Sequence, residues 1–420
     1  MMNDALRLGW SYIKLDELGF IGRGKSKHRP RDDPSLYEGK YPFIQTGEVK
    51  AANLYISQYS QTYNEKGLSQ SKLWKPETLL ITIAANIAET AILKIEACFP
   101  DSIVGFVADP KKADVRFVKY CMDTMKLRMQ NVSKGTTQDN LSLDKLLTFN
   151  FLMPPLPTQH KIAAILSAYD DLIENNTRRI KILEKMAHAL YREWFVNFRF
   201  PGHEKVKMVE SELGMVPEGW EVKKLSAFVE TQYGYTESAS EIEIGPKFIR
   251  GMDINKTSYI QWDTVPFCPI NADDYSKYKI KVGDILVIRM ADPGKVGIIE
   301  KNIDAVFASY LIRLKITSNC ISPYYLFYFL QSDRYQGYVT GASTGTTRKS
   351  ASAGVITDIN MFIPPDDIRI QFEDSVSTIR RMLNNLLDRN TNLRRTRDLL
   401  LPKLISGEVD VSNLEIKTEV

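Results

Sequence analysis

Residues 19–26, GFIGRGKS, match the phosphate-binding pattern GxxxxGK(S/T) at every required position. In such a loop backbone amides hold the phosphates, Lys25 would contact phosphate and Ser26 would bind magnesium. That chemistry needs a buried strand before the loop and a helix after it. Here Pro30 and Pro34 disfavour a helix, and the second half of the chain has no equivalent loop. We therefore interpret the match as coincidental. An ATPase remains only an alternative, which unchanged activity of Lys25→Ala would remove.

The same segment is strongly basic, and its glycines let the backbone come close to a partner. It suits contact with nucleic-acid phosphates or base edges, while a solvated run of charge is the competing interpretation. The corresponding stretch of the second half, YGYTESASEIE, is acidic, so we predict that the two halves read different half-sites. The candidate contacts are Arg23, Lys25, Lys27 and Arg29, with His28 and Arg31 beside them.

A short polar segment, GTT, occurs once in each half and is the second candidate contact. Its hydroxyls and the neighbouring amide and cations suit hydrogen bonds to phosphates and base edges. A structural turn kept by duplication is the alternative. The candidates are Lys134, Thr136, Thr137 and Gln138 in the first half and Thr346, Thr347, Arg348 and Lys349 in the second, with Arg250, Arg289 and Lys295 as weaker candidates beside turns.

The composition describes an ordinary soluble protein, with 44% hydrophobic and 25% charged residues. A net charge of +4 does not by itself indicate a nucleic-acid partner, so basic residues would have to be concentrated locally. The cysteines (Cys98, Cys121, Cys268 and Cys320) and the four histidines are scattered, which predicts no metal site and a reducing compartment. The N-terminus has no signal pattern, so we expect a cytoplasmic protein.

Catalytic motifs are missing from the sequence. There is no (D/N/S)PP(Y/F) methyltransferase motif, because the proline pairs read MPPL and IPPD. We find no glycine-rich cofactor loop after a strand, no PD…ExK nuclease core and no Ser/His/Asp or Cys/His set. The sequence therefore predicts a non-catalytic chain without a cofactor.

The two halves of the chain are copies of one plan. Gly9-Trp10 recurs as Gly219-Trp220, 210 residues later, and the GTT segment and the proline pair recur at the same offset. Each half begins with short β-prone runs such as TLLITI and DILVIR, followed by one amphipathic helix, expected over 115–129 and 324–335. The predicted fold class is α/β (α+β), with β-rich domains over 1–156 and 210–366 and long helices over 157–200 and 367–410.

Each long helix carries apolar residues at alternating steps of four and three, the pattern by which two helices pack as a coiled coil. We call these positions the seam; they run from Ile162 to Trp194 and from Phe372 to Leu404, and each includes one asparagine, Asn176 or Asn390. An asparagine there can fix the register of the pair. Packing of each stripe on its own domain is the alternative.

We expect the two helices to pack on each other, antiparallel if an approximate two-fold axis relates the halves. A seam from Ile162 to Trp194 is about 50 Å long at ~1.5 Å per residue, or roughly 15 base pairs at ~3.4 Å each. The helices would then set the spacing between two half-sites read by two domains.

The strings YREWFVNFRFPG (191–202) and TRDLLLPKLISGEVD (396–410) resemble the conserved regions of specificity subunits of type I restriction–modification enzymes. The pattern GTTQ followed by PPLPTQ resembles the end of their target recognition domains. The resemblance covers the whole chain. It implies a DNA-binding subunit whose two target recognition domains read a bipartite site. It also implies two methyltransferase subunits docked on the helices and restriction subunits added to that core. DNA methylation and ATP-dependent cleavage would belong to those partners.

Large apolar residues at the helix ends are either core or docking surface for these partners: Trp194, Phe195, Leu400 and Leu404. Arg397 occupies a seam position where the first half has Ala187, which argues against symmetric docking. Two alternatives remain. One is the specificity subunit of a type II system that cuts on both sides of its site. The other is a coiled-coil scaffold that does not contact DNA.

Overall fold

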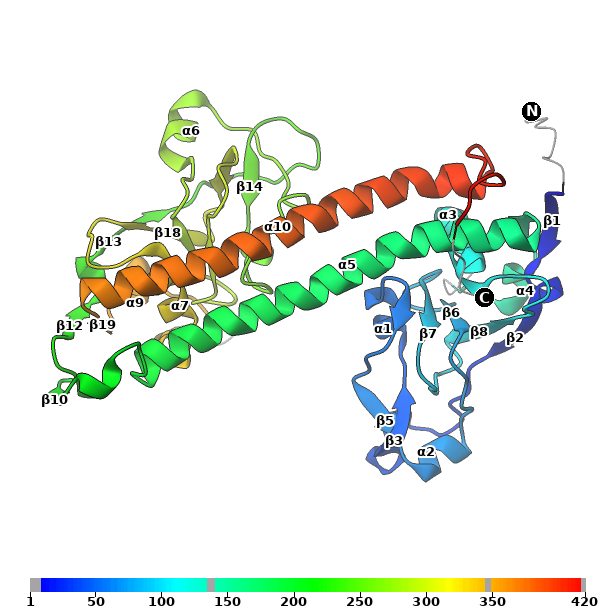
Figure 1. Ribbon diagram of the computed structural model, residues 1–420, viewed down its shortest axis with the longest axis horizontal. Helices are drawn as coiled ribbons and strands as arrows, with labels where there is room; N and C mark the ends of the chain where they lie inside the picture. Colours follow the sequence, from blue (N-terminus) through cyan, green and yellow to red (C-terminus); the bar gives the residue numbers. More distant parts are fainter. Residues whose placement is uncertain (1–8, 134–139, 344–348, 417–420) are drawn as a thin grey trace. The chain divides into compact units, whose positions relative to one another are not determined.

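The computed structural model describes residues 9–133, 140–343 and 349–416. The chain divides into two compact units (Figure 1). Unit 1 comprises Met1–Asn176 and Asn390–Val420, and unit 2 comprises Thr177–Arg389. Each unit therefore contains one part of each long helix together with its own β-rich domain.

The sheet of unit 1 has five strands in the order β2-β8-β6-β7-β4. Its central strand β6 is buried along its whole length. Leu79 and Ile81 face the core shared with the helices, while Leu80 faces a second core on the opposite side. The strands are β1 (Ser11–Lys14), β2 (Gly19–Arg23), β3 (Tyr37–Phe43), β4 (Tyr55–Ile56), β5 (Gln61–Tyr63), β6 (Thr78–Thr82), β7 (Thr90–Leu93), β8 (Ile103–Ala108) and β9 (Asn150–Met153).

Helix α3 joins this sheet to the long helices. Phe117 and Cys121 of α3 are buried in one core with Leu166 of the long helix α5 (Leu156–Tyr191) and Leu404 of the long helix α10 (Asp366–Ile405). The predicted helix over 115–129 is thus confirmed, and it continues to Ser133. The shorter helices of unit 1 are α1 (Thr46–Ala51), α2 (Glu65–Ser69), α3 (Val115–Ser133) and α4 (Leu143–Leu146), with single turns η1 (Leu15–Glu17) and η2 (Pro34–Leu36).

The sheet of unit 2 repeats that of unit 1 without the edge strand, in the order β13-β18-β15-β16. The pairing of β12 with β19, in which Glu221 lies opposite Ile363, repeats the pairing of Ser11 with Met153 in unit 1. The strands are β10 (Met208–Ser211), β11 (Gly214–Pro217), β12 (Glu221–Lys224), β13 (Val229–Tyr233), β14 (Lys247–Ile249), β15 (Ile285–Ile288), β16 (Val296–Ile298), β17 (Ala305–Phe307), β18 (Leu311–Ile316) and β19 (Asn360–Ile363).

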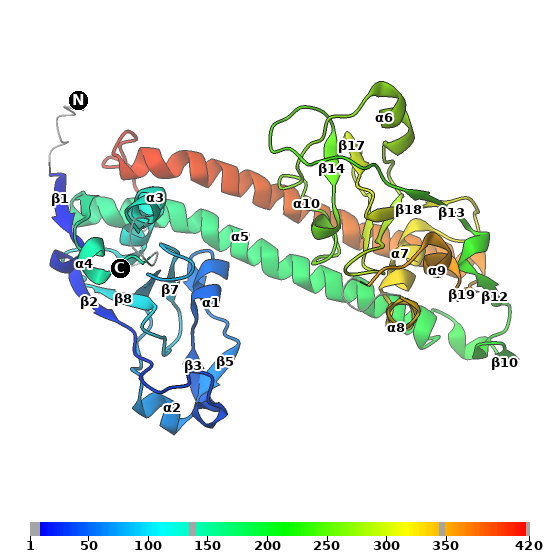
Figure 2. The same cartoon turned by 180° about the vertical axis from the view of Figure 1, so that it is seen from behind.

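The helix expected over 324–335 is wrong in one respect, because the structure has two helices there (Figure 2). The break falls at Ser332, whose hydroxyl accepts a hydrogen bond from the amide of Tyr335 and so begins a new helix. The shorter helices of unit 2 are α6 (Ala272–Tyr278), α7 (Pro323–Gln331), α8 (Asp333–Ala342) and α9 (Ala353–Thr357), with turns η3 (Arg192–Val196, π-helical), η4 (His203–Lys205), η5 (Leu225–Ala227) and η6 (Gly251–Asp253).

The long helices are α5 (Leu156–Tyr191) and α10 (Asp366–Ile405), of 36 and 40 residues. In unit 1 the beginning of α5 packs in one core with the end of α10. In unit 2 Ile180 and Leu183 of α5 pack on Leu383 and Leu386 of α10. The helices are therefore antiparallel, the orientation expected if an approximate two-fold axis relates the halves.

The two seam asparagines contact each other. The side-chain amide of Asn176 donates to the side-chain oxygen of Asn390 at 2.9 Å, and both residues are buried. The nitrogen of the Asn390 side chain lies 3.3 Å from the backbone oxygen of Ile173. At the positions related by the duplication, Ile180 and Leu386 form an apolar layer instead. The polar layer thus occurs in unit 1 without a polar counterpart at the equivalent place in unit 2, which favours a single register of the helix pair.

Asn390→Leu should lower the free energy of unfolding by about 1–3 kcal/mol, because it leaves the buried amide of Asn176 without its partner. Asn176→Leu/Asn390→Leu should recover this loss, since an apolar layer replaces the polar one. Urea unfolding of the purified chain measures both, with exposed Asn392→Leu as control. Equal midpoints for the single and double variants would show that the asparagine pair is not coupled.

Candidate nucleic-acid interface

The basic segment after β2 is held against the loop that precedes β8. Arg23 donates two hydrogen bonds to the backbone oxygen of Asp101, at 3.1 and 2.7 Å. Arg31 pairs with the Asp101 carboxylate at 2.6 Å, and Arg29 donates to the backbone oxygen of Ser26 at 2.6 Å. These exposed arginines therefore shape the segment as well as contributing positive charge.

The phosphate-loop pattern does not form a phosphate loop. Its first glycines lie in strand β2, and no helix follows it. A side chain at Gly24 would come within 2.2 Å of the backbone oxygen of Pro100, and one at the equivalent Gly234 within 2.2 Å of the backbone oxygen of Ala308. In both units, a glycine is therefore needed at this position because the backbone of a neighbouring segment leaves no room for a side chain.

Two lysines of the segment, Lys25 and Lys27, are exposed and form no ion pair with the described residues. Nearby, the ammonium of Lys72 lies 3.6 Å from the centroid of the Trp74 ring and 4.8 Å from that of Phe20. Partial burial and, after it, the charge of Lys25 lower the pKa of Lys72. Lys72 and the exposed ring of Phe20 thus extend the basic surface formed by Lys25 and Lys27. The sequence did not indicate these two residues as candidate contacts, because each lies outside any recognisable motif.

A polar concavity of about 310 Å³ adjoins the same segment. Its lining includes Ser26, Arg31, Gln45 and Gln61. The side-chain amide of Gln45 donates to Gln61 at 2.5 Å. Paired amides beside arginine are groups that suit hydrogen bonds to base edges. The two glutamines were missed from the sequence because they lie in separate segments that only the fold brings together.

Several predicted contacts lie outside the described residues, so the structure does not place them. They are Lys134, Thr136, Thr137, Gln138, Thr346, Thr347 and Arg348.

In unit 2, the structure brings Arg289 and Lys349 together. The backbone oxygens of Arg289 and Lys349 accept hydrogen bonds from Ala351 and Ala291, at 2.9 and 3.0 Å. The guanidinium of Arg289 lies 4.8 Å from the ring centroid of Tyr233, which is partly exposed. Through this backbone pairing half-buried Arg289 lies near exposed Lys349, and it also lies beside the ring of Tyr233.

Arg250 and Lys295 lie apart from that pair of cations. The guanidinium of Arg250 pairs with Asp253 at 3.1 Å and closes the turn η6. Lys295 lines a different pocket, beside α5. The segment equivalent to the basic one carries exposed Glu237, Glu241 and Glu243. The two units thus present different charges at equivalent places.

Unit 2 fixes its domain to both long helices through one buried arginine. Arg380 of α10 is fully buried and binds the Glu300 carboxylate with two hydrogen bonds, of 2.8 and 2.6 Å. It also donates to the hydroxyl and backbone oxygen of Ser258, at 2.9 and 2.8 Å. The Ser258 hydroxyl in turn donates to Glu184 of α5 at 2.6 Å. The domain therefore has a defined orientation on the helices within this unit.

In unit 1, a different set of residues holds the domain on the two long helices. Asp170 of α5 is buried and accepts hydrogen bonds from Tyr120 of α3, at 2.5 Å, and from Arg397 of α10. Burial first, and then the charge of Asp170, raise the pKa of Tyr120. The sequence treated Arg397 as a misfit in the seam; the structure shows that it pairs with Asp170 instead.

The four predicted docking residues are largely used within the chain. Trp194 and Phe195 are buried in the core of unit 2, and Leu404 in that of unit 1, while Leu400 is half-buried. Exposed apolar side chains do occur on the long helices. They are Leu172, Ile182 and Met186 on α5, Val196 just after it, and Ile370, Met382 and Leu399 on α10.

Among the residues that the structure describes, no group of three or more His, Cys, Asp or Glu is arranged to hold a metal ion. Within the same part of the chain, each helix is too short or too polar to cross a membrane.

A family model described as "Type I restriction modification DNA specificity domain" matches the chain twice, over residues 8–185 and 217–392. Two relatives from Methanocaldococcus jannaschii are named type I restriction enzyme MjaIX and MjaVIII specificity subunits. They are 25% and 24% identical, and each match covers 96% of this chain and 94% of the relative. The crystal structure of a type I restriction-modification system S subunit from M. genitalium has the same fold. It gives a TM-score of 0.60 at 16% identity, covering 96% of this chain and 98% of that chain. Because two copies of the family model together match most of its length, the chain belongs to the type I restriction modification DNA specificity domain family.

Proposed function

We propose that this chain is the DNA sequence-recognition subunit of a type I restriction–modification complex. Each unit would read one half of a bipartite site. The observation that carries this is a duplicated domain, held on an antiparallel helix pair by a buried polar network in each unit. Two unlike surfaces, each fixed to the long helices within its own unit, suit recognition of two unlike half-sequences. The family description and the names of the relatives favour this function over the type II and scaffold alternatives.

We assign the target recognition domains to residues 1–156 and 210–366, and the conserved helical regions to 157–200 and 367–410. Within these regions α5 ends at Tyr191 and α10 ends at Ile405. The DNA contacts would include Lys25 and Lys27 in the first domain and Lys349 in the second, because these cations are exposed. Half-buried Arg289 lies beside Lys349 and would add to the positive charge there. The chain itself would be non-catalytic and work without a cofactor. Its four free cysteines fit a reducing compartment such as the cytoplasm.

Methyltransferase subunits would dock on the exposed apolar side chains of the helix pair, rather than on buried Trp194 or Phe195. Leu172, Ile182 and Met186 each immediately precede a seam residue of α5, and Met382 and Leu399 do so on α10. In an antiparallel pair, positions of this kind on both helices lie on the same flank of the seam. The duplication supports two methyltransferase subunits, to which restriction subunits would be added.

Mapping of modified bases tests this proposal. The chain is expressed with a methyltransferase subunit of its own system, and the methylated positions in host DNA are determined. We expect one bipartite sequence. Replacing residues 210–366 with the matching segment of another family member should change one half-sequence and leave the other unchanged. A correctly assembled complex that methylates without sequence preference would exclude the proposed function.

A further inference from the structure

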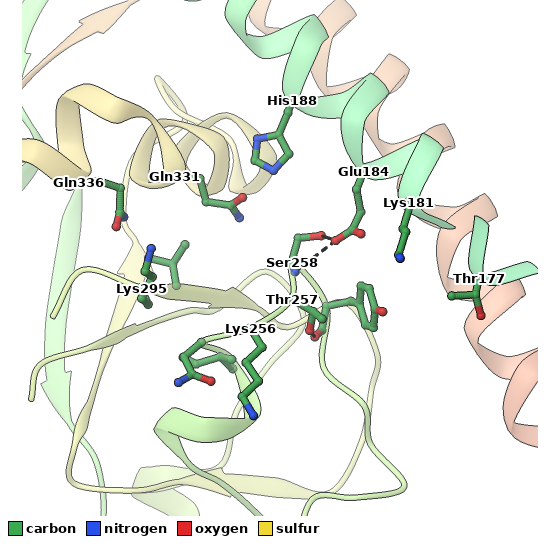
Figure 3. A pocket seen from close by; sticks show the side chains of 14 residues that line it. Thr177, Lys181, Glu184, His188, Lys256, Thr257, Ser258, Lys295, Gln331 and Gln336 are labelled. Carbon is green, nitrogen blue, oxygen red and sulfur yellow. Dashed lines mark hydrogen bonds between the residues drawn. The ribbon is translucent and has the colours of Figure 1, made fainter. Parts of the chain in front are cut away.

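A polar pocket of about 450 Å³ lies in unit 2 between α5 and the segment around Ser258 (Figure 3). One wall is a face of α5 that includes Lys181 and Glu184. A second wall is the segment containing Lys256 and Ser258, and a third carries Lys295 with Gln331 and Gln336. The volume lies in the ~300–1,000 Å³ range of small-ligand pockets, so it can hold more than a single small ion.

The pocket has an excess of positive charge. Lys181, Lys256 and Lys295 come from three different segments, and none forms an ion pair with any described residue. The carboxylate in the wall is that of Glu184, which already accepts hydrogen bonds from the Ser258 hydroxyl and amide, at 2.6 and 3.3 Å. Desolvation lowers the pKa of His188, which favours the uncharged imidazole. Three lysines and one carboxylate leave two positive charges uncompensated.

The wall also offers a hydrogen-bond donor without an acceptor. The side-chain nitrogen of Gln331 is buried and has no partner within the described part of the chain. The neighbouring Gln336 amide is already engaged, since it donates to the backbone oxygens of Gly294 and Leu330 at 2.7 and 2.6 Å. Figure 3 shows Lys295 on the same side of the pocket as both glutamines, and Lys181 and Lys256 on other sides. An anion with several acceptor oxygens would satisfy these donors.

We propose that this pocket binds a phosphate group of the DNA backbone, a role that rests on the proposed function. Ammonium groups approaching from three segments suit a phosphate, whose oxygens point in several directions. The pocket adjoins Ser258, which links Glu184 of α5 to Arg380 of α10. A phosphate held there contacts the domain and its supporting helix at once. Binding of the backbone is therefore coupled to the orientation of the second recognition domain.

The pocket is not duplicated. By the register of the repeat, Lys181, Lys256 and Lys295 correspond to Thr391, Ala51 and Glu89 in unit 1. Glu89 there pairs with Lys126 at 2.7 Å. The phosphate contact is consequently expected only beside the half-site that unit 2 reads.

The experiment uses the complete complex with its methyltransferase subunits and a duplex containing the mapped site. Binding is measured over a series of KCl concentrations for Lys181→Gln/Lys256→Gln/Lys295→Gln. The matched control is Lys223→Gln/Lys279→Gln/Lys315→Gln, which removes three lysines of unit 2 outside the pocket. Losing one phosphate contact should reduce the slope of log affinity against log salt by about 1 and weaken all sequences equally. The control should keep the wild-type slope.

A scan with single methylphosphonates locates the contact. The wild-type complex should lose affinity at one or two neutralised phosphates beside the unit 2 half-site, and the pocket variant should be insensitive at those positions. A wild-type salt slope in a folded pocket variant would overturn the inference. Inorganic phosphate bound in the pocket without any change in DNA slope would also overturn it, and would assign the pocket to a free anion. If the wild-type complex shows no sequence preference, the proposed function itself fails.

Discussion

Arg380→Met should lower the free energy of unfolding by about 3–5 kcal/mol, the usual loss when one partner of a buried ion pair is removed. Arg380 is fully buried, and the side chain of its partner Glu300 is only 7% exposed. Without the guanidinium, Glu300 keeps a single hydrogen bond from a side chain, that of the Tyr324 hydroxyl at 3.0 Å. The backbone oxygen of Ser258 also loses its donor.

Urea unfolding of the purified chain measures this loss, with the exposed neighbour Arg381→Met as the matched control. Arg380→Met/Glu300→Met should recover much of the stability, because no buried charge is then left unpaired. Should Arg380→Met cost no more than Arg381→Met, the ion pair would not be what fixes the domain to α10.

Phe195→Ala should cost about 3–5 kcal/mol, as expected when a buried aromatic side chain is removed from a core. Phe195 is 2% exposed. Its ring lies 4.7 Å from the rings of both Tyr325 and Phe372, and 5.8 Å from that of Trp220. These rings belong to α7, α10 and the start of the second domain. The substitution therefore opens a cavity where three parts of unit 2 meet.

Val196→Ala is the matched control, because Val196 is the next residue and is 53% exposed. We expect its effect on unfolding to stay within about 0.5 kcal/mol. If exposed apolar residues near the helix end dock the methyltransferase, Val196→Ala should weaken assembly while leaving the chain stable. A stable Phe195→Ala variant that fails to assemble would contradict this and would indicate that Phe195 contacts the methyltransferase.

The duplication and the pairing of the long helices could be predicted because both are periodic features of the sequence. The antiparallel orientation is not a periodic feature; it is expected only if an approximate two-fold axis relates the two halves. A seam can be recognised in a single helix from apolar residues at alternating steps of four and three. A repeat can be recognised from residues that recur at a fixed offset. Neither requires knowing which helix packs on which. The asparagine pair is an intermediate case. Asn176 and Asn390 were each recognised as polar seam residues, but their mutual hydrogen bond depends on how the two helices pair.

The buried networks could not be predicted because their members are far apart in the chain. Arg397 looked like a misfit until its partner Asp170 was located. Arg380 was not singled out at all, because it lies beside the seam and resembles an ordinary exposed helix residue. In the basic segment the sequence indicated the positive charge, but it did not indicate which of these side chains form contacts within the chain. Arg23 and Arg31 engage Asp101, while Lys25 and Lys27 form no ion pair with described residues.

We propose that the helix pair fixes the distance between the two half-sites. Each unit keeps its own internal contacts if seven residues are inserted at the boundary of the units, between Asn176 and Thr177 and between Arg389 and Asn390. One heptad in each helix preserves the seam frame and adds about 10 Å at ~1.5 Å per residue. That length corresponds to about three base pairs at ~3.4 Å each. An insertion in α5 alone mismatches the seam and should abolish specific methylation.

The decisive measurement is a map of methylated bases in DNA modified by the complex carrying the paired insertion, compared with the wild-type map. We predict the same two half-sequences separated by a gap about three base pairs longer. An active complex that methylates the original site, with its gap unchanged, would contradict the claim that the paired helices set the spacing.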